Sequence, residues 1–210
     1  MDNAKCKKCR RAGDKLFLRG DRCLSQKCAL IRRNSAPGPQ GKKKKFGGLS
    51  EYGKQLKEKQ KLKFWYGLRE KQFKNYFKEA LSKRKQLEDI DLHLGQKLES
   101  RLDNIIFRFG FASSRIQARE LLNHGHFFLN GKRCNIPSIQ TKKGDVVCVK
   151  PISFKKKYFQ NLLPLIKKYQ VPSWLELDKE KLEGKILRMP QLEEINLPVE
   201  LSIILEFYSR

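Results

Sequence analysis

The sequence predicts an α+β protein that is mostly helical. Three observations carry this prediction. Apolar residues recur at helical spacing over much of residues 50–124, an Asn130-Gly131 dipeptide follows the short apolar run HFFL, and four cysteines are paired near the N-terminus. We therefore expect an N-terminal metal knuckle, a helical domain, and a module of two helices followed by a small antiparallel sheet.

The first 28 residues hold four of the six cysteines. Cys6 and Cys9 are separated from Cys23 and Cys28 by 13 residues, which places four thiolates on two turns, as a closed tetrahedral zinc site requires. The segment has too few apolar side chains for a core, and metal binding would supply the missing folding free energy. An iron–sulfur cluster uses the same ligands, and four unligated cysteines are the other alternative. The spacing favours one Zn²⁺ ion in a zinc knuckle.

The charge of the chain limits its partners. Lys and Arg number 47 against 22 Asp and Glu, a formal charge of +25, and residues 1–50 hold 15 basic and 3 acidic residues. Such an imbalance disfavours a compact state unless an anion neutralises it, and nucleic acid is the obvious polyanion. No stretch approaches the ~20 apolar residues of a membrane-spanning helix. The N-terminus also lacks the apolar core of a signal peptide, so we expect an intracellular protein without a membrane partner.

The stretch RRNSAPGPQGKKKKFGG follows the cysteines. Its Pro, Gly and consecutive Lys residues disfavour a helix or a core, which predicts a linker or an RNA-tracking arm, with a solvated tail as the alternative. The candidate RNA contacts in the cysteine segment and this arm are Arg10, Arg11, Arg32, Arg33, Lys42, Lys43, Lys44 and Lys45.

Two helices are expected next. Ser50 is a candidate N-cap of EYGKQLKEKQKLKFWYG, whose apolar stripe ends at Gly67 and whose opposite face is rich in lysine. EKQFKNYFKEALSKRK repeats the pattern, and its aromatic residues are expected in a core rather than as base-stacking platforms. The candidate RNA contacts of this helical domain are Lys59, Lys61 and Lys63.

The module begins near residue 98. Leu98 to Phe109 read as one amphipathic helix, and Ser113 or Ser114 caps a second helix that is closed by Gly125. The run HFFL, the Asn130-Gly131 turn and the run VVCVK then predict short antiparallel strands.

Basic residues gather along this module. Arg115 and Arg119 share a helix face, and histidines and basic turn residues follow, which favours contact with an RNA backbone. A solvated helix face is the alternative, as is pairing of Arg119 with Asp103 or Glu120. A metal role for the HGH pair lacks a third ligand nearby. The candidate RNA contacts are Arg101, Arg115, Arg119, His124, His126, Asn130, Lys132 and Arg133.

The C-terminal part is nearly neutral and more apolar. Residues 155–169 are expected to form a connecting helix broken by Pro164, and the apolar end of the chain should pack back on another element.

Several stretches resemble a known family. ESRLDNIIFRFGFASSRIQARELLNHGHFFLNGK resembles the RNA-binding module named after the fourth protein of the small ribosomal subunit, which some pseudouridine synthases, tRNA synthetases and heat-shock RNA-binding proteins share. GDKLFLRGDRC, SEYGKQLKEKQKLKFWYG, REKQFKNYF and EFYSR extend the likeness to the bacterial-type family of small-subunit ribosomal protein four, bacterial or organellar, in its zinc-binding cysteine-containing form.

The resemblance implies an architecture and a role. It implies a zinc-binding basic segment (1–45), a helical domain (46–97) completed by 162–210, and an inserted module (98–161). The family binds the 5′ domain of small-subunit ribosomal RNA, nucleates assembly of the subunit body, neighbours small-subunit protein five, influences decoding accuracy and lines the mRNA entry channel. The expected place is the cytoplasmic ribosome, or an organelle's stroma or matrix, without homo-oligomers.

Two other functions are weighed against this one. An RNA-modifying or RNA-chaperone protein would use the same module as a tether, but an enzyme needs convergent titratable groups that the remaining segments do not offer. A zinc-finger DNA-binding regulator would need a finger helix ending in histidines or a dimerising element, and the sequence has neither. We therefore expect no enzymatic activity.

Overall fold

The computed structural model describes residues 4–38, 48–83 and 89–209. The chain divides into two compact units, one made of residues 1–94 with 196–210 and the other of residues 95–195. The predicted contacts Lys42, Lys43, Lys44 and Lys45 lie outside the described residues. Within the described part, no helix is long and apolar enough to span a bilayer.

The first unit is helical. Its helices are α1 (Ala4–Ala12), α2 (Asp21–Leu24), α3 (Ala29–Arg32), α4 (Glu51–Trp65), α5 (Glu70–Ser82) and α10 (Leu201–Ser209). Helix α6 (Ile90–Glu99) begins in this unit and ends in the next. The N-cap prediction at Ser50 is confirmed, because its side chain accepts a hydrogen bond from the amide of Gly53 at 3.2 Å.

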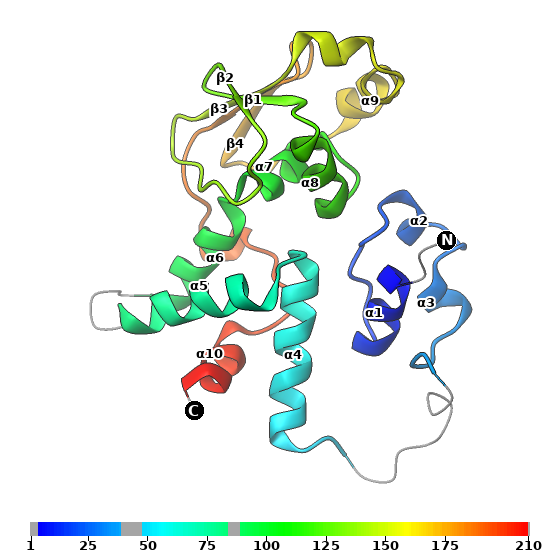
Figure 1. Ribbon diagram of the computed structural model, residues 1–210, viewed down its shortest axis with the longest axis vertical. Helices are drawn as coiled ribbons and strands as arrows, with labels where there is room; N and C mark the ends of the chain where they lie inside the picture. Colours follow the sequence, from blue (N-terminus) through cyan, green and yellow to red (C-terminus); the bar gives the residue numbers. More distant parts are fainter. Residues whose placement is uncertain (1–3, 39–47, 84–88, 210) are drawn as a thin grey trace. The chain divides into compact units, whose positions relative to one another are not determined.

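The C-terminal helix α10 packs against α4 and α5 (Figure 1). The ring of Tyr208 lies 6.3 Å from that of Phe73 and 5.3 Å from that of Phe77. Both phenylalanines are fully buried on α5, as the helical spacing predicts for core residues. The expected return of the chain end onto the helical domain is therefore present, and it begins at Asn196.

The second unit is α+β. Its helices are α7 (Leu102–Arg108), α8 (Arg115–Asn123), α9 (Lys157–Lys168) and the 3₁₀ turns η2 (Pro151–Lys155) and η3 (Leu192–Glu194). Its strands are β1 (Phe127–Leu129), β2 (Lys132–Cys134), β3 (Val146–Val149), β4 (Leu175–Asp178) and β5 (Glu183–Ile186). In the described part they form an antiparallel sheet of order β2-β1-β3-β5-β4.

Helices α7 and α8 pack on one side of this sheet (Figure 1), and their apolar side chains share one core with those of β1, β3 and α9. The ring of Phe109 lies directly over Gly184 of β5, where an added Cβ would come within 2.3 Å of the ring. Only glycine allows this close approach between strand and helix. The core thus fixes α7 and α8, which carry several of the predicted RNA contacts.

One helix prediction is wrong in its continuity. Residues 98–109 do not form a single helix, because α6 ends at Glu99 and α7 begins at Leu102. Between them Arg101 is extended and forms a β-bridge with Gln140, while Thr141 donates two hydrogen bonds to the carbonyl of Ser100. These contacts with a distant segment satisfy the backbone outside the helix, which periodicity alone does not reveal.

The C-terminal boundary of the module also differs from the expected residue 161. The compact unit extends to Ile195, because β5 pairs with β3 and carries β4 with it. Pro164 lies inside α9 and does not end it. The buried stripe Phe159, Leu162 and Ile166 holds α9 on the core despite the backbone hydrogen bond that proline lacks.

Candidate nucleic-acid interface

The structure brings the four N-terminal cysteines together. Cys6 and Cys9 lie on α1, Cys23 lies on α2, and Cys28 is the N-cap residue of α3. All four are free thiols that line one small cavity. The paired spacing therefore produces a cluster of thiols at the meeting point of three short helices.

The surroundings of the thiols suit the thiolate form in one respect and oppose it in another. Burial, together with the neighbouring thiols, raises the pKa of Cys9 and of Cys23. Backbone amides act in the other direction, since Arg19 N–H donates to Cys23 Sγ at 3.4 Å and Leu16 provides a similar bond to Cys9. Among the described residues, no three His, Cys, Asp or Glu side chains are placed as ligands of a metal ion.

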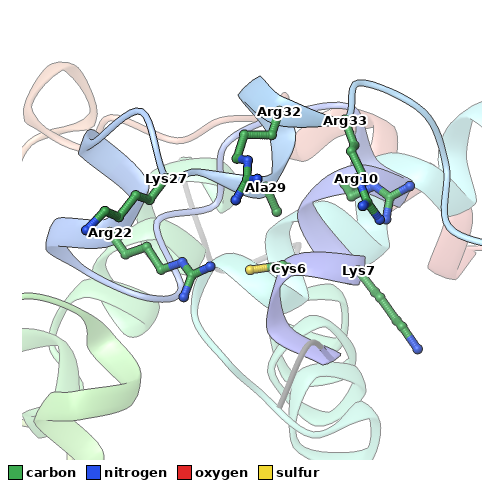
Figure 2. Close-up of a pocket in the computed structure, with 8 residues that line it drawn as sticks. All are labelled: Cys6, Lys7, Arg10, Arg22, Lys27, Ala29, Arg32 and Arg33. Carbon is green, nitrogen blue, oxygen red and sulfur yellow. The ribbon is translucent and has the colours of Figure 1, made fainter. Parts of the chain in front are cut away.

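A second hollow of about 250 Å³ lies beside the thiols (Figure 2). Cys6 and Ala29 line it together with six basic side chains: Lys7, Arg10, Arg22, Lys27, Arg32 and Arg33. The predicted contacts Arg10, Arg32 and Arg33 therefore converge on one place. Arg11 does not line this hollow; it is exposed on α1 and borders a different groove between α1 and α4.

The three predicted lysines of α4 form ion pairs within the protein, contrary to their predicted position on an RNA-facing surface. Lys59 is buried, forms an ion pair with Glu70, and stands over the rings of Phe207 and Tyr208 at 4.9 and 5.3 Å. Lys63 binds the same carboxylate at 2.7 Å. These two lysines hold α4, α5 and α10 together.

Lys61 is also paired. Its ammonium lies 2.7 Å from Asp14 and 3.9 Å from Glu58, and its side chain is mostly buried. Hydrogen bonds to the charged group and ring contacts explain why a lysine-rich face is not a solvated face here. The helical pattern shows only on which side a lysine lies; Asp14, the nearer carboxylate, comes from the segment after α1.

Two of the predicted arginines of the module bind one buried carboxylate. Arg101 is 2% exposed and donates from Nε and Nη2 to Asp103 at 3.1 and 2.9 Å. Arg119 donates to Asp103 Oδ2 at 3.0 and 2.5 Å. The alternative in which Arg119 pairs with Asp103 is thus the one that the structure shows.

Arg115 belongs to a second buried network. It is 8% exposed, donates to Asn104 Oδ1 at 2.7 Å, and lies 3.8 Å from Glu99. The same Glu99 accepts two hydrogen bonds from Arg108 at 2.7 and 2.8 Å. Arg115 and Arg119 do share a helix face, but that face packs on α7 rather than facing outward.

Exposed basic groups of the module gather instead around Gly125 and His126. His126 is buried, its Nδ1 lies 2.9 Å from Ser153 Oγ, and its Nε2 lies 3.4 Å from Lys156 Nζ. The guanidinium of Arg133 lies over Gly125, where an added Cβ would come within 2.8 Å of it. We call the residues His124, Arg133, Lys150 and Lys156 around His126 the module cluster.

The electric environment of His126 reflects these neighbours. Burial lowers the pKa of His126, and the charges of Lys156, His124 and Lys150 lower it further. The ring is therefore neutral near pH 7. Of the predicted RNA contacts, His124 and Arg133 are exposed members of the module cluster, whereas His126 is buried beneath them.

The two remaining predicted RNA contacts, Asn130 and Lys132, lie in the hairpin turn and at the start of β2. Asn130 and Gly131 have φ values of 50° and 75°, the left-handed backbone of the predicted turn. Asn130 is occupied by the fold, since it donates to Asp145 at 2.9 Å and accepts from the amide of Val146 at 2.8 Å. Lys132 is exposed on β2.

Five basic residues of the two surfaces were absent from the sequence-based set: Lys7, Arg22, Lys27, Lys150 and Lys156. The first three carry no motif beyond the high positive charge of residues 1–50. Lys150 and Lys156 flank η2, and only the fold brings them to His126.

The sequence of the chain matches known protein families along nearly its whole length. Residues 1–99 match the "Ribosomal protein S4/S9 N-terminal domain" family, and residues 100–147 match the "S4 domain" family. The chain is 46% identical over 207 residues to "Small ribosomal subunit protein uS4" of Acetivibrio thermocellus, covering 99% of this chain and 97% of the relative. The protein of the same name from Syntrophobacter fumaroxidans is 47% identical over 208 residues, covering 99% of this chain and 98% of the relative. The chain therefore belongs to the uS4 family of small ribosomal subunit proteins.

Proposed function

We propose that the protein is a structural constituent of the small ribosomal subunit that binds ribosomal RNA and performs no chemistry. The observation that carries this proposal is the likeness to uS4 proteins along nearly the whole chain. The positive charge of +25 supports it, because a folded polyanion neutralises the self-repulsion of such a chain.

The two exposed basic surfaces favour recognition through phosphates. The hollow of α1, α2 and α3 and the module cluster present Arg, Lys and His side chains, which position a protein on an RNA backbone without reading its bases. Folded RNA offers little base-edge information in its deep groove, so shape and phosphate contacts are the expected mode. The buried ion pairs of the module keep α7 and α8 rigid beside the cluster.

The finer role follows from the family resemblance. We expect binding to the 5′ domain of the small-subunit RNA, early participation in assembly of the subunit body, contact with small-subunit protein five, and a position near the mRNA entry channel with an effect on decoding accuracy. The place of action is the ribosome, in one copy per subunit.

The proposal is tested by co-sedimentation. The native protein is expected to travel with small subunits through a high-salt gradient and to protect 5′-domain RNA from chemical probing. An RNA-modifying or RNA-chaperone protein would leave the subunits at high salt and would act on more than one copy of its RNA. Recovery of the protein only in free fractions would contradict the structural role.

A metal ion held by Cys6, Cys9, Cys23 and Cys28 forms a separate part of the proposal. Four free thiols line one cavity and two of them accept backbone N–H bonds, so the donor set suits a zinc ion, with an iron–sulfur cluster as the alternative. When bound, zinc would cross-link three short helices that have little apolar core. Helices α1, α2 and α3 hold the four thiols around one cavity, and the amides of Arg19 and Leu16 donate to Cys23 and Cys9.

Elemental analysis of the purified protein tests the metal. About one zinc per chain is expected. Cys9→Ser should lose the zinc and expose residues 4–38 to protease, whereas Cys134→Ser, a matched change of a buried cysteine in the other unit, should keep it. Protease resistance of residues 4–38 in metal-free protein would contradict a zinc knuckle, and visible absorbance of iron would favour the cluster.

A further inference from the structure

The hollow beside the cysteines concentrates positive charge, and among the described residues it has no acidic partner. Its lining consists of six basic side chains, one thiol and one methyl group, and within the described residues no carboxylate lines it or pairs with those six. In the module, by contrast, Arg101 and Arg119 lie against Asp103 and Arg108 lies against Glu99. Cations left together in this way repel one another unless an anion from outside binds between them.

The walls of the hollow are held in place by the fold. Arg10 on α1 donates from Nε to the carbonyl of Ser35 at 2.8 Å and from Nη2 to that of Ala36 at 3.4 Å, which ties α1 to the segment after α3. Figure 2 shows the guanidinium of Arg22 turned toward the thiol of Cys6, while Lys7 points outward. Arg22 and Cys6 also line the cavity of the cysteine cluster, so the cluster and the hollow share a wall.

The chemistry of the lining selects a ligand. It contains no aromatic ring to stack on a base and no amide side chain to read a base edge. Four of the six cations are arginines, whose planar forks match the oxygen atoms of phosphate. Each backbone phosphate carries one negative charge, so one phosphate would leave most of the six cations uncompensated.

We propose that this hollow is a binding site for consecutive backbone phosphates of the ribosomal RNA, with Arg22 of α2 and Arg32 of α3 as principal donors. The proposal rests on the RNA-binding function proposed above and assigns to that function a particular site. It predicts recognition of the RNA backbone that does not depend on the bases at this point.

The test compares two full-length variants that lose equal charge. Arg22→Gln/Arg32→Gln removes two cations from the hollow, and Lys74→Gln/Lys78→Gln removes two exposed cations from α5 in the same unit. Binding to a transcript of the 5′ domain is titrated at several salt concentrations. Each phosphate that is no longer bound should reduce the slope of log affinity against log salt by about 0.7–0.9. The hollow variant should also bind about tenfold more weakly for each such phosphate, and the α5 variant should keep most of the wild-type slope.

A charge-conserving variant separates contact from folding. Arg22→Lys/Arg32→Lys should keep the salt slope while binding more weakly than wild type, because an ammonium does not form the bidentate contact of a guanidinium. Zinc content and protease pattern must match wild type in every variant compared. Equal slopes for the hollow and α5 variants, with tight salt-dependent binding by wild type, would overturn the site and leave the ribosomal function standing. Absence of salt-dependent binding by wild type would overturn both.

Discussion

Arginine has different roles in the N-terminal segment and in the module. Arg101 in the module is 2% exposed and donates twice to Asp103, whereas Arg22 in the N-terminal segment is exposed and lines a hollow to which the described part of the chain contributes no carboxylate. The same side chain is thus part of the fold in one place and available to RNA in the other. What differs is the residue that the fold places opposite it.

The contrast also explains why a shared helix face does not identify an RNA-binding face. Arg115 and Arg119 lie on one side of α8, as their spacing predicts, but that side packs on α7. There it meets Asp103 and Asn104, which are almost fully buried. An arginine that is bound to a buried carboxylate stabilises the fold and is costly to withdraw for another partner.

The largest effect is expected when the carboxylate of this network is neutralised. Asp103→Asn leaves Arg101 and Arg119 without their anionic partner, and breaking a buried pair in this way lowers stability by about 3–5 kcal/mol. Urea unfolding measures the change in free energy. Asp21→Asn, a change of an exposed carboxylate on α2, should alter the unfolding free energy by no more than about 0.5 kcal/mol. Unchanged stability of Asp103→Asn would contradict the structural role of these arginines.

Local signals were sufficient for several elements of the fold. Ser50 and Ser114 cap helices as expected, since each side-chain oxygen accepts an amide three residues later. The Asn130-Gly131 dipeptide predicted the hairpin because few residues accept two successive positive φ angles. Such features depend on neighbours in the sequence and can be predicted from it.

Elements that depend on distant partners could not be predicted. Strands β4 and β5 are short and charged, and they exist because β5 pairs with β3. Part of the candidate site could not be predicted for the same reason, because Lys59 meets a carboxylate from α5 and Lys156 meets His126 from across the module. Charge and spacing show where a cation lies along the chain, but its pairing is a tertiary property.

The next largest effect is expected for the module cluster. Its loss should weaken RNA binding and leave stability nearly unchanged, whereas loss of the buried network lowers stability. Arg133→Gln/Lys156→Gln should weaken binding to 5′-domain RNA by about 1.5–3 kcal/mol for each phosphate that is no longer bound. Stability should change little, because both side chains are exposed. Filter binding and urea unfolding are measured on the same samples, with Lys167→Gln/Lys168→Gln at the end of α9 as the charge-matched control. Equal affinities for the two double variants would remove the cluster from the RNA interface.

A smaller effect is expected where α10 joins the helical unit. Tyr208 donates a hydrogen bond to Glu70 Oε1 at 3.3 Å, beside the Lys59 and Lys63 ammonium groups that bind the same carboxylate. Tyr208→Phe keeps the ring and removes the hydroxyl, so stability should fall by about 0.5–1.5 kcal/mol. Tyr52→Phe, whose exposed ring packs on Phe207, serves as the control and should be nearly neutral by thermal unfolding. RNA affinity should stay at the wild-type value in both variants, as expected of residues that serve the fold.

The smallest effect separates a structural histidine from an RNA contact. Burial and the charges of Lys156, His124 and Lys150 lower the pKa of His126 in the folded protein, while an unfolded histidine has a pKa of about 6.5. As the pH falls through 6.5, His126 binds a proton in the unfolded state but remains neutral in the folded state. Stability conferred by neutral His126 is therefore complete above pH 6.5 and is lost as the pH falls below it, by at most about 1.4 kcal/mol per pH unit.

Urea unfolding between pH 7.5 and 5.5 should show this decrease in wild type, a somewhat smaller decrease in His124→Gln, which loses one of the charges that lower the pKa of His126, and the smallest decrease in His126→Gln. The same slope in all three proteins would mean that other groups titrate. Bound RNA should weaken the effect of these charges, because phosphates beside Lys156 and Arg133 offset the positive charges that lower the pKa of His126. If the cluster contacts RNA, saturating 5′-domain transcript should therefore reduce the acid sensitivity of wild type and leave that of His126→Gln unchanged. If it does not, the two proteins should respond to RNA alike, and the hollow of α1, α2 and α3 would have to carry the phosphate contacts without the module.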